Sequence, residues 1–370
     1  MSTSVKHHYV PQWYQKGFLE EGQTQLYVLD KSPARFPLPN GGYSTAKDVY
    51  QKGPGAIFFE KHLYTVQAFG QANDDIERYL FGAIDAKGAE ANSALLADDQ
   101  EKIHSLFVNV FEFMDALRLR TPKGLSWLKE VGKTKSQMQL MFFMQELRRM
   151  HCVMWMEGIL EIVSAKNSKH SFIFSDHPVT LFNPHIFPVG PSGQPTEDPR
   201  QEWIGTQTIF PFDKDNLFIL THLEAAEGVG PSRARTPRTN ARLFDNSLVR
   251  HDKTIRGREL TDEQVAAVNY IIKQRAHKCI AAGTLEGLYP EKHLKNRMWP
   301  KLGQFLLPSR IKTFKSGGEI FIKMNDGSFM FQDEYGRRPA TKNEHTAKVA
   351  EAEAMERHFL KLLAEYKAKK

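Results

Sequence analysis

The sequence predicts an α+β protein, mainly helical with a small mixed sheet, that carries a C-terminal hairpin and helix as an appendage. Apolar residues recur at helical spacing in several long stretches. Short apolar runs bounded by Pro, Gly and Asp lie between them and are typical of strands. Of the 370 residues, 41% are apolar and 25% charged, a globular composition that excludes a mostly disordered or fibrous chain.

The N-terminal half is predicted to begin with strands and to continue with helices. The predicted elements are strands at 6–10 and 25–30 and helices at about 75–96, 99–120 and 136–163. Asp98 or Asp99 is suited to cap the second helix. Thr121-Pro122 should end that helix, because the residue before a proline avoids the helical conformation. The third helix is rich in Met and aromatic residues, which indicates packing against neighbouring helices.

The second half alternates short strands with two helices. The predicted elements are strands at 171–174, 206–210 and 217–221, a helix at 261–283, a hairpin at 319–332 and a helix at 343–367. Thr261 and Gln264 have the spacing of a capping box at a helix start, and Gly283 suits the end of that helix. Asn325-Asp326-Gly327 is a tight hairpin signal.

Charge is distributed unevenly along the chain. Residues 1–120 contain 12 basic and 15 acidic residues, a net charge of −3, whereas residues 285–370 contain 17 and 11, a net charge of +6. We therefore expect a main domain at 1–284 and a basic C-terminal hairpin and helix at 285–370. Two cysteines, Cys152 and Cys279, exclude a disulfide framework and a four-thiolate metal site.

Several classes of protein have no support in the sequence. No stretch of 18 apolar residues lacks charge, and the start of the chain has no apolar run after its charges, so we expect neither a membrane span nor a signal peptide. A cytoplasmic protein without a membrane partner is the expectation. Phosphate-binding loops, the dinucleotide fingerprint, the zinc-protease motif and the nucleophile elbow are absent from the sequence.

The first polar group of interest is His7-His8-Tyr9-Val10-Pro11-Gln12. Neighbouring residues of a strand face opposite sides, so only one of the two histidines should reach a given site. Histidine exchanges protons near neutral pH and binds metals when neutral. The alternative is that these are two polar residues at a strand start, one of them simply hydrogen-bonded in the core.

The second group is Ser175-Asp176-His177-Pro178, directly after the apolar run 172–174. Side chains at strand ends often line a site, because the strand fixes them and the loop gives access. The alternative is a turn, in which Asp bonds its own backbone two residues on and Pro sets the next dihedral angle. Both interpretations can hold together.

Two further groups place polar residues beside apolar stripes. Arg118 and Arg120 precede Thr121-Pro122 at a helix end, where a buried arginine must be paired or must bind an anion. A cation at a helix C-terminus also offsets the helix dipole. Asn269 lies on an apolar helix face, where its amide must be satisfied, often by tying one segment to another.

In this order the motifs resemble a bacterial family known as domain of unknown function 4238. The similar segments are His7–Gln12, Gly17-Phe18, Leu26–Lys31, Lys47–Tyr50, Arg120–Pro122, Ser175–Pro178, and Asn269 with Arg275 in the last helix. The chain departs from the family pattern at Gln15-Lys16 and has His177 where Asn is common. The resemblance covers about residues 6–282, the remaining tail being an addition, and it implies no function.

The leading hypothesis is an enzyme acting on phosphodiesters or nucleotides, a nuclease-like effector such as those of toxin or antiviral defence systems. Its predicted catalytic residues are His7, His8, Arg120 and Asp176, which would activate water and stabilise phosphate charge. A divalent metal is one cofactor that this set could hold, through His8 and Asp176. The predicted substrate-binding residues are Gln12, Ser175, Asn269, Arg233, Arg235, Arg238 and Arg242.

The alternative is a non-catalytic module that binds nucleic acid or a partner protein. The four arginines between 233 and 242 have no acidic residue among them, and six basic residues with no acid lie between 295 and 315. Basic side chains contact phosphates, and Trp299, Phe305 and Phe314 could stack on exposed bases. Each stretch could equally be a solvated surface. Nucleic acid is thus the predicted partner, and the sequence leaves the oligomeric state open.

Overall fold

A computed structural model of the chain describes residues 6–39, 41–64, 66–68, 71–73, 81–133, 136–225, 228–238, 254–307, 319–333, 338–339 and 341–368. The chain divides into two compact units, Met1–Pro308 and Ser309–Lys370. The first unit contains two larger sheets and a group of helices, which agrees with the predicted α+β class.

The larger sheet of the first unit has five strands in the order β11-β12-β13-β9-β14. The strands are β9 (Ile159–Ser164), β11 (Thr180–Phe182), β12 (Gln207–Pro211), β13 (Asn216–Thr221) and β14 (Ile255–Glu259). β14 runs parallel to β9, and the other neighbours are antiparallel. The predicted mixed sheet is therefore present.

A second, antiparallel sheet has four strands in the order β10-β15-β2-β5. The strands are β2 (Leu26–Asp30), β5 (Val49–Lys52), β10 (Phe174–Ser175) and β15 (Cys279–Ala282). This sheet brings the N-terminal segment beside two segments from the second half of the unit. The sheet content therefore exceeds the single small sheet predicted from the sequence.

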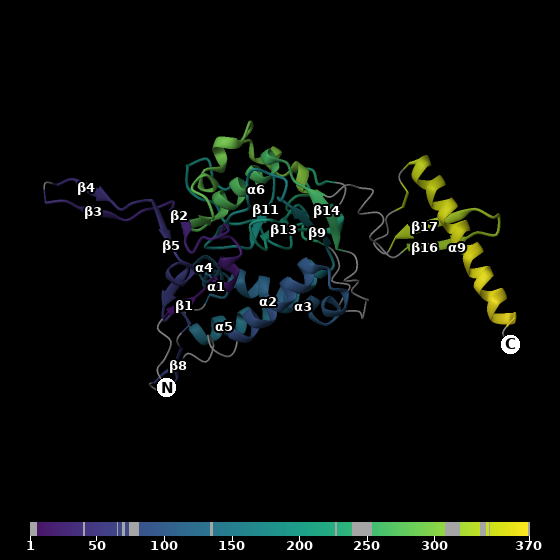
Figure 1. Ribbon diagram of the computed structural model, residues 1–370, viewed down its shortest axis with the longest axis horizontal. Helices are drawn as coiled ribbons and strands as arrows, with labels where there is room; N and C mark the ends of the chain where they lie inside the picture. The colour runs from purple at the N-terminus through teal and green to yellow at the C-terminus, as the bar shows by residue number, and fades with distance from the viewer. Residues whose placement is uncertain are drawn as a thin grey trace. The chain divides into compact units, whose positions relative to one another are not determined.

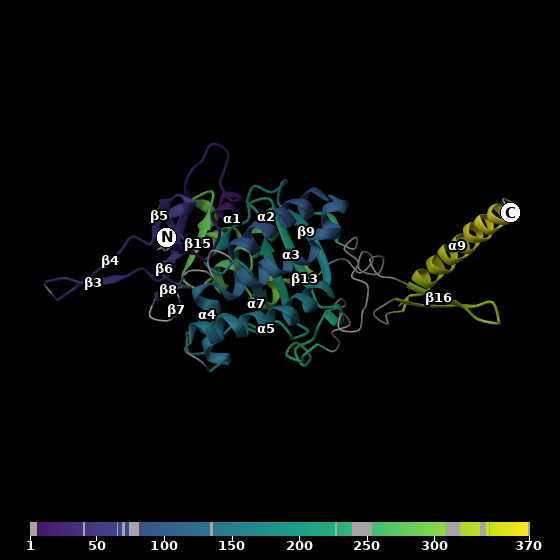
Figure 2. The same ribbon diagram turned by 90° about the horizontal axis from the view of Figure 1, so that it is seen from below.

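Helices cover both sides of the larger sheet (Figure 1). On one side lie α2 (Gly82–Ala97), α3 (Gln100–Leu119), α4 (Pro122–Val131) and α5 (Gln137–Met156), which Figure 2 shows together. On the other side lies α6 (Asp262–Arg275). Nearly all residues of β9, β11, β12 and β13 are consequently buried, whereas β14 at the edge of the sheet is partly exposed.

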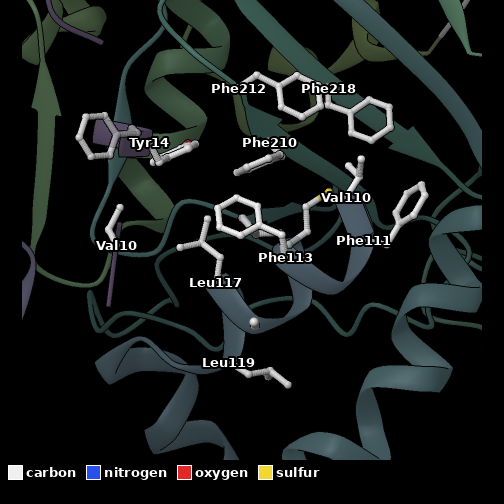
Figure 3. Packing of buried hydrophobic residues seen from close by; sticks show 14 of the residues in the cluster. Val10, Tyr14, Val110, Phe111, Phe113, Leu117, Leu119, Phe210, Phe212 and Phe218 are labelled. Carbon is white, nitrogen blue, oxygen red and sulfur yellow. The ribbon is translucent and has the colours of Figure 1, made fainter. Parts of the chain in front are cut away.

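Side chains of the larger sheet alternate between two apolar clusters. Phe210 and Phe218 belong to the same cluster as Phe113 of α3, whose ring centroid lies 6.2 Å from that of Phe210 (Figure 3). Ile209 and Ile219 belong to the other cluster, with the apolar residues of α6. Burial on both faces explains why β9 and β13 are nearly continuous apolar runs.

Shorter elements complete the first unit. They are β1 (Lys6–His8) paired with β6 (Phe59–Lys61), α1 (Gln12–Lys16), the hairpins β3 (Arg35–Pro37)–β4 (Tyr43–Thr45) and β7 (Val66–Ala68)–β8 (Gln71–Asn73), α7 (Trp299–Leu302), and the 3₁₀ helices η1 (Pro54–Ala56), η3 (Leu223–Ala225), η6 (Glu286–Leu288), η7 (Pro290–His293) and η8 (Gln304–Leu306).

The helix predicted at 136–163 is a helix followed by a strand. α5 ends at Met156, and Ile159–Ser164 forms β9 between β13 and β14. A Cβ on Gly158 would lie 2.9 Å from the Thr221 carbonyl oxygen, so the turn between the two elements requires this glycine. The prediction was wrong because a strand buried on both faces has the same apolar run as a buried helix.

The helix predicted at 261–283 begins as expected and ends early. Thr261 and Gln264 form both bonds of the capping box. α6 ends at Arg275, and residues 279–282 form β15 between β10 and β2. Residues 279–282 form a strand because they pair with strands that are distant in the sequence. The spacing of apolar residues within the segment cannot reveal such pairing.

Other predicted helix boundaries agree with the structure. Asp99 caps α3 by accepting a hydrogen bond from the Lys102 amide, and α3 ends at Leu119 beside Thr121-Pro122. α2 runs from Gly82 to Ala97, and the predicted start of that helix near residue 75 lies outside the described residues.

The second unit contains the predicted hairpin and helix. β16 (Glu319–Lys323) pairs with β17 (Phe329–Asp333), and α9 spans Lys342–Ala368. Gly327, in the turn, has a φ angle of 81°, which glycine adopts without strain. The ring centroid of Phe331 lies 5.3 Å from that of His345, so the hairpin packs on the helix.

The boundary between the units lies after Pro308 and not near Thr284 as predicted. Residues 285–307 pack on the first unit through apolar side chains of the α6 cluster. These side chains are Leu288, Trp299, Leu302 and Leu306, each at most 5% exposed. The step in charge near residue 284 therefore does not coincide with the boundary between the units.

A chain ending after Leu307 is expected to melt cooperatively, and a chain ending after Thr284 is not. Burial of each large apolar side chain contributes roughly 1.5–3 kcal/mol, and a whole domain is stable by only about 5–15 kcal/mol. Circular dichroism melting of the two truncated chains measures the difference. Equally cooperative transitions in both chains would contradict this division.

Candidate functional site

Hydrogen bonds bring the first and third motif segments together. The Tyr64 amide donates to Nδ1 of His7 at 3.0 Å, and the Tyr64 hydroxyl donates to the Arg120 carbonyl at 2.7 Å. Nε of Arg120 donates to the Tyr9 carbonyl at 3.0 Å. The segments 6–12 and 118–122 are thus joined both directly and through Tyr64.

Thr121 joins these segments to the motif at 175–178. Its backbone is extended, as the following proline requires, and Pro122 is the first residue of α4. Oγ1 of Thr121 accepts the Gly124 amide at the start of α4 and lies 2.7 Å from Nδ1 of His177. The three segments singled out in the sequence therefore meet around the α3–α4 junction.

The two adjacent histidines face different environments, as the alternation of a strand predicts. His7 is fully buried and stacks on the Tyr64 ring, with centroids 5.6 Å apart. His8 is half-buried and lies 5.4 Å from the Phe59 ring. Burial lowers the pKa of His8, which favours its neutral form.

Arg120 is a fully buried arginine with several partners. One of its terminal guanidinium nitrogens lies 2.9 Å from Oδ1 of Asp85, and the guanidinium lies 5.3 Å from the centre of the Phe81 ring. Burial raises the pKa of Asp85, and the charge of Arg120 offsets part of that shift. These partners are what a buried arginine requires.

The carboxylate of Asp176 accepts three backbone hydrogen bonds. The amides of His277, Lys278 and Cys279 donate to it at 3.0, 2.7 and 2.8 Å. The residue is 4% exposed, and burial raises its pKa against the opposing effect of these bonds. Asp176 thereby fixes the turn between α6 and β15. This structural role is enough to explain why a buried carboxylate lies here.

The predicted group of four catalytic residues therefore meets only in part. His7 and Arg120 are linked through Tyr64, and Asp176 is held by backbone amides. His8, the other predicted metal ligand, packs against Phe59. These contacts are those of a structural framework.

Three predicted substrate-binding residues have distinct surroundings. Oγ of Ser175 accepts the His177 amide at 3.0 Å, so this segment does turn, but through the serine and not through Asp176 as the alternative interpretation had it. Asn269 accepts the Ile173 amide and donates to the Ser171 carbonyl, so it ties α6 to the segment before β10 as expected. Gln12 is exposed at the start of α1.

The four predicted arginines also differ. Arg233 and Arg235 are exposed on the loop 228–238. Arg238 is paired with Glu157 and donates to the Met154 carbonyl at 3.0 Å, so its charge is compensated inside the fold. Arg242 lies outside the described residues.

A buried ionic network at the α3–α4 junction went unnoticed in the sequence apart from Arg118. Its first part is Asp115, Arg118 and His151: Nδ1 of His151 lies 2.7 Å from Oδ1 of Asp115 and 3.1 Å from a terminal nitrogen of Arg118. Burial lowers the pKa of His151, and the charge of Arg118 lowers it further. Asp115 lies three residues before Arg118, a spacing that could have indicated the group.

The second part of this network surrounds Asp198. Nζ of Lys123 lies 2.7 Å from its carboxylate, and an Arg275 guanidinium nitrogen lies 3.7 Å away. Burial would raise the pKa of Asp198, but the charges of Lys123 and Arg275 lower it. Burial and Lys123 lower the pKa of His177 to about 3, so this histidine is neutral near pH 7. The charges in both parts of the network are thus paired internally.

Among the described residues, one group of three side chains could hold a metal ion. It consists of His170, Glu286 and His293, whose ligand atoms all lie within 4.8 Å of one another. None of the three belongs to the motifs singled out in the sequence. His170 follows a polar turn and His293 a charged segment, and neither pattern indicates a metal by itself.

Comparison with known proteins identifies the family. Residues 6–285 match the family described as protein of unknown function (DUF4238), and the chain belongs to it. The match agrees with the resemblance over residues 6–282. No match was found among curated proteins or among solved structures. In the part of the chain that the structure describes, no helix is both long and apolar enough to cross a membrane.

Replacing Asp176 with alanine is expected to lower the free energy of unfolding by about 3 kcal/mol, because three partly buried amides lose their acceptor at about 1 kcal/mol or more each. Urea unfolding measures the change. Asp48→Ala, at an exposed aspartate, is the control and should stay within about 0.5 kcal/mol of the unchanged protein. Unchanged stability in Asp176→Ala would show that the carboxylate does not hold this turn.

Histidine 177 is expected to make the fold sensitive to acid. The pKa of His177 is 6.5 in the unfolded chain and about 3 in the folded protein. Between these two pH values the unfolded state binds a proton that the folded state does not bind. The resulting loss of stability grows as the pH falls and reaches about 2 kcal/mol at pH 5. His177→Gln should remove this contribution, whereas His104→Gln, on an exposed residue, should not. If the unfolding free energy of the unchanged protein and of His177→Gln falls equally with pH, this role of His177 is refuted.

Proposed function

We propose that the chain binds nucleic acid through a basic face formed by residues 228–238 and 292–301. The observation that carries the proposal is that one buried residue, Asn183, contacts both segments. They are far apart in the sequence, and each was predicted separately as a basic stretch. Together they offer more positive charge in one region than either does alone.

Asn183 directly follows β11 and is fully buried. Its Nδ2 donates to the Ala234 carbonyl at 3.0 Å, and its backbone carbonyl accepts Nε1–H of Trp299 at 2.9 Å. The side-chain amide of Asn183 thus holds the backbone of the first segment, and its backbone carbonyl holds the indole of Trp299 in the second. The basic face therefore rests on a rigid support.

Exposed basic side chains project from both segments. They are Arg233 and Arg235 on the first and Lys292, Lys295, Arg297 and Lys301 on the second. Ala234, between the two arginines, is fully buried, which fixes the loop from which they project. Cations on a fixed surface neutralise phosphates and release counterions, which favours binding of a polyanion.

The aromatic residues predicted to stack on bases do not support base stacking. Trp299 is 5% exposed and packs in the α6 cluster, Phe305 is half-buried against that cluster, and Phe314 lies outside the described residues. The proposed contacts are therefore made to the phosphate backbone. Binding of this kind depends weakly on base sequence.

A second candidate function is cleavage of the bound phosphodiester, as in an effector of a toxin or antiviral system. The observation that favours it is the position of His293 between Lys292 and Lys295 of the basic face. Histidine beside phosphate-binding cations can assist hydrolysis as a base or as a metal ligand. The predicted catalytic residues His7, Arg120 and Asp176 are engaged in the framework and contribute less to this candidate.

The basic face is tested by replacing Arg233, Arg235, Lys295 and Lys301 together with glutamine. Affinity for DNA and RNA duplexes and single strands at low salt should fall by at least about tenfold, because four phosphate contacts are lost. The slope of log affinity against log salt should fall in magnitude by about 0.7–0.9 for each lost contact. Fluorescence anisotropy at several salt concentrations measures both quantities.

The matched control replaces four lysines that are exposed elsewhere on the first unit with glutamine. These lysines are Lys16, Lys52, Lys87 and Lys129, and the control has the same net charge as the variant of the basic face. It should bind almost as the unchanged protein does. Equal losses in the two variants would mean that net charge alone attracts the polyanion, and no binding at low salt would refute the function. Incubating the bound strands with Mg²⁺, Mn²⁺ or Zn²⁺ and analysing their length separates binding from cleavage.

A further inference from the structure

His170, Glu286 and His293 come together on the surface of the first unit from two separate segments. The two imidazole centroids lie 4.3 Å apart, and Nε2 of His293 lies 3.1 Å from a carboxylate oxygen of Glu286. The exposed fraction of the side chain is 26% for His293 and 64% for Glu286. Both histidines are half-buried, so one side of the group is fixed and the other is open to solvent.

The segment that carries His170 is held in place by its neighbours. The amide of Lys169 donates to Oδ1 of Asp262 at 2.8 Å, and the His170 amide donates to Oγ of Ser168 at 3.0 Å. The next residue, Ser171, is bound through its carbonyl by Asn269 of α6. The imidazole therefore projects from a backbone with little freedom to move.

The segment that carries Glu286 and His293 is held by the same helix. Nζ of Lys273 on α6 donates to the Leu288 carbonyl at 2.7 Å and to the Glu291 carboxylate at 2.9 Å. Leu288 is fully buried in the α6 cluster. Both segments are thus fixed to α6, which keeps the two histidines at a constant separation.

Nε2 of His293 has no hydrogen-bond partner among the described residues, in spite of its short distance to Glu286. This nitrogen is inaccessible to solvent, and the Glu286 oxygen lies 3.1 Å away. A buried ring nitrogen without a partner is unfavourable. A cation placed between this nitrogen, the second imidazole and the carboxylate would satisfy all three groups.

We propose that His170, Glu286 and His293 bind a divalent transition-metal ion, with Zn²⁺ as the ion that fits best. Two imidazoles and one carboxylate favour such ions over Mg²⁺ and Ca²⁺, which prefer oxygen ligands alone. Ligands of tetrahedral zinc lie about 3.3 Å apart for bonds of about 2.0–2.1 Å. The Glu286 oxygen and Nε2 of His293 already lie 3.1 Å apart, and the other separations in the group, at most 4.8 Å, shorten to that spacing by rotation of the side chains.

Three protein ligands leave at least one coordination position open. Structural zinc sites normally have four protein ligands, whereas sites that bind water or a substrate oxygen keep a position free. The solvent-exposed side of this group therefore suits an ion that also binds water or an anion. The proposal goes beyond nucleic-acid binding and does not depend on it.

The test is calorimetric titration of ZnCl₂ into full-length protein, expressed without a histidine tag, stripped with EDTA and dialysed. The expected result is one saturable Zn²⁺ site per chain and no such site for Mg²⁺. His170→Ala and His293→Ala should each weaken Zn²⁺ binding by more than about tenfold. Replacement of Zn²⁺ by Co²⁺ should give the visible absorption of a four- or five-coordinate ion, which the same variants should abolish.

The control is His104→Ala, which removes an exposed histidine of α3 and should bind Zn²⁺ as the unchanged protein does. If either histidine variant fails to fold, Glu286→Gln, at an exposed side chain, tests the same site without disturbing the core. Absence of one-to-one binding would overturn the proposal. So would Zn²⁺ affinity that is unchanged in His170→Ala, His293→Ala and Glu286→Gln, or that falls equally in His104→Ala.

Discussion

The burial of the Arg120 guanidinium is the constraint on which the main unit depends. An arginine without solvent costs several kcal/mol unless its charge and hydrogen-bond donors are paired. Its partners are the Tyr9 carbonyl and the Asp85 carboxylate, so the N-terminal segment and α2 must both pack against the end of α3. The next residue, Thr121, meets His177 from the second half of the unit. One junction therefore orders segments from the whole unit.

The fold could be predicted from the sequence where local chemistry decides it. The Asp99 cap of α3 and the capping box at Thr261 depend on residues three apart, so both were found. The strand 159–164 and the strand 279–282 were not found, because each is defined by neighbours more than fifty residues away in the sequence. Two-sided burial removed the alternating polar residues that would have revealed them.

The proximity of the motif segments could be predicted from the sequence in part, and the contacts of their residues less so. The polar motifs do meet, because buried polar groups must find one another, and Asn269 ties two segments as its position on an apolar face indicates. The acceptor role of Asp176 could not be predicted, since its donors are backbone amides about a hundred residues away. Spacing likewise cannot separate Arg238, paired inside the fold, from the exposed Arg233 and Arg235.

This division between paired and exposed charge decides where a polyanion can be attracted. Charges paired at about 3 Å within the interior largely cancel one another's field outside the protein. Arg120 with Asp85, and Lys123 with Asp198, are such pairs, so the motif segments contribute little to long-range attraction. The cations on the two segments bound by Asn183 are exposed, and the one ion pair that they form among the described residues, Lys295 with Glu263 at 3.6 Å, lies in solvent, so their field extends outside the protein. Replacing motif residues should therefore change the stability of the fold, whereas replacing residues of the basic face should change the proposed binding of nucleic acid.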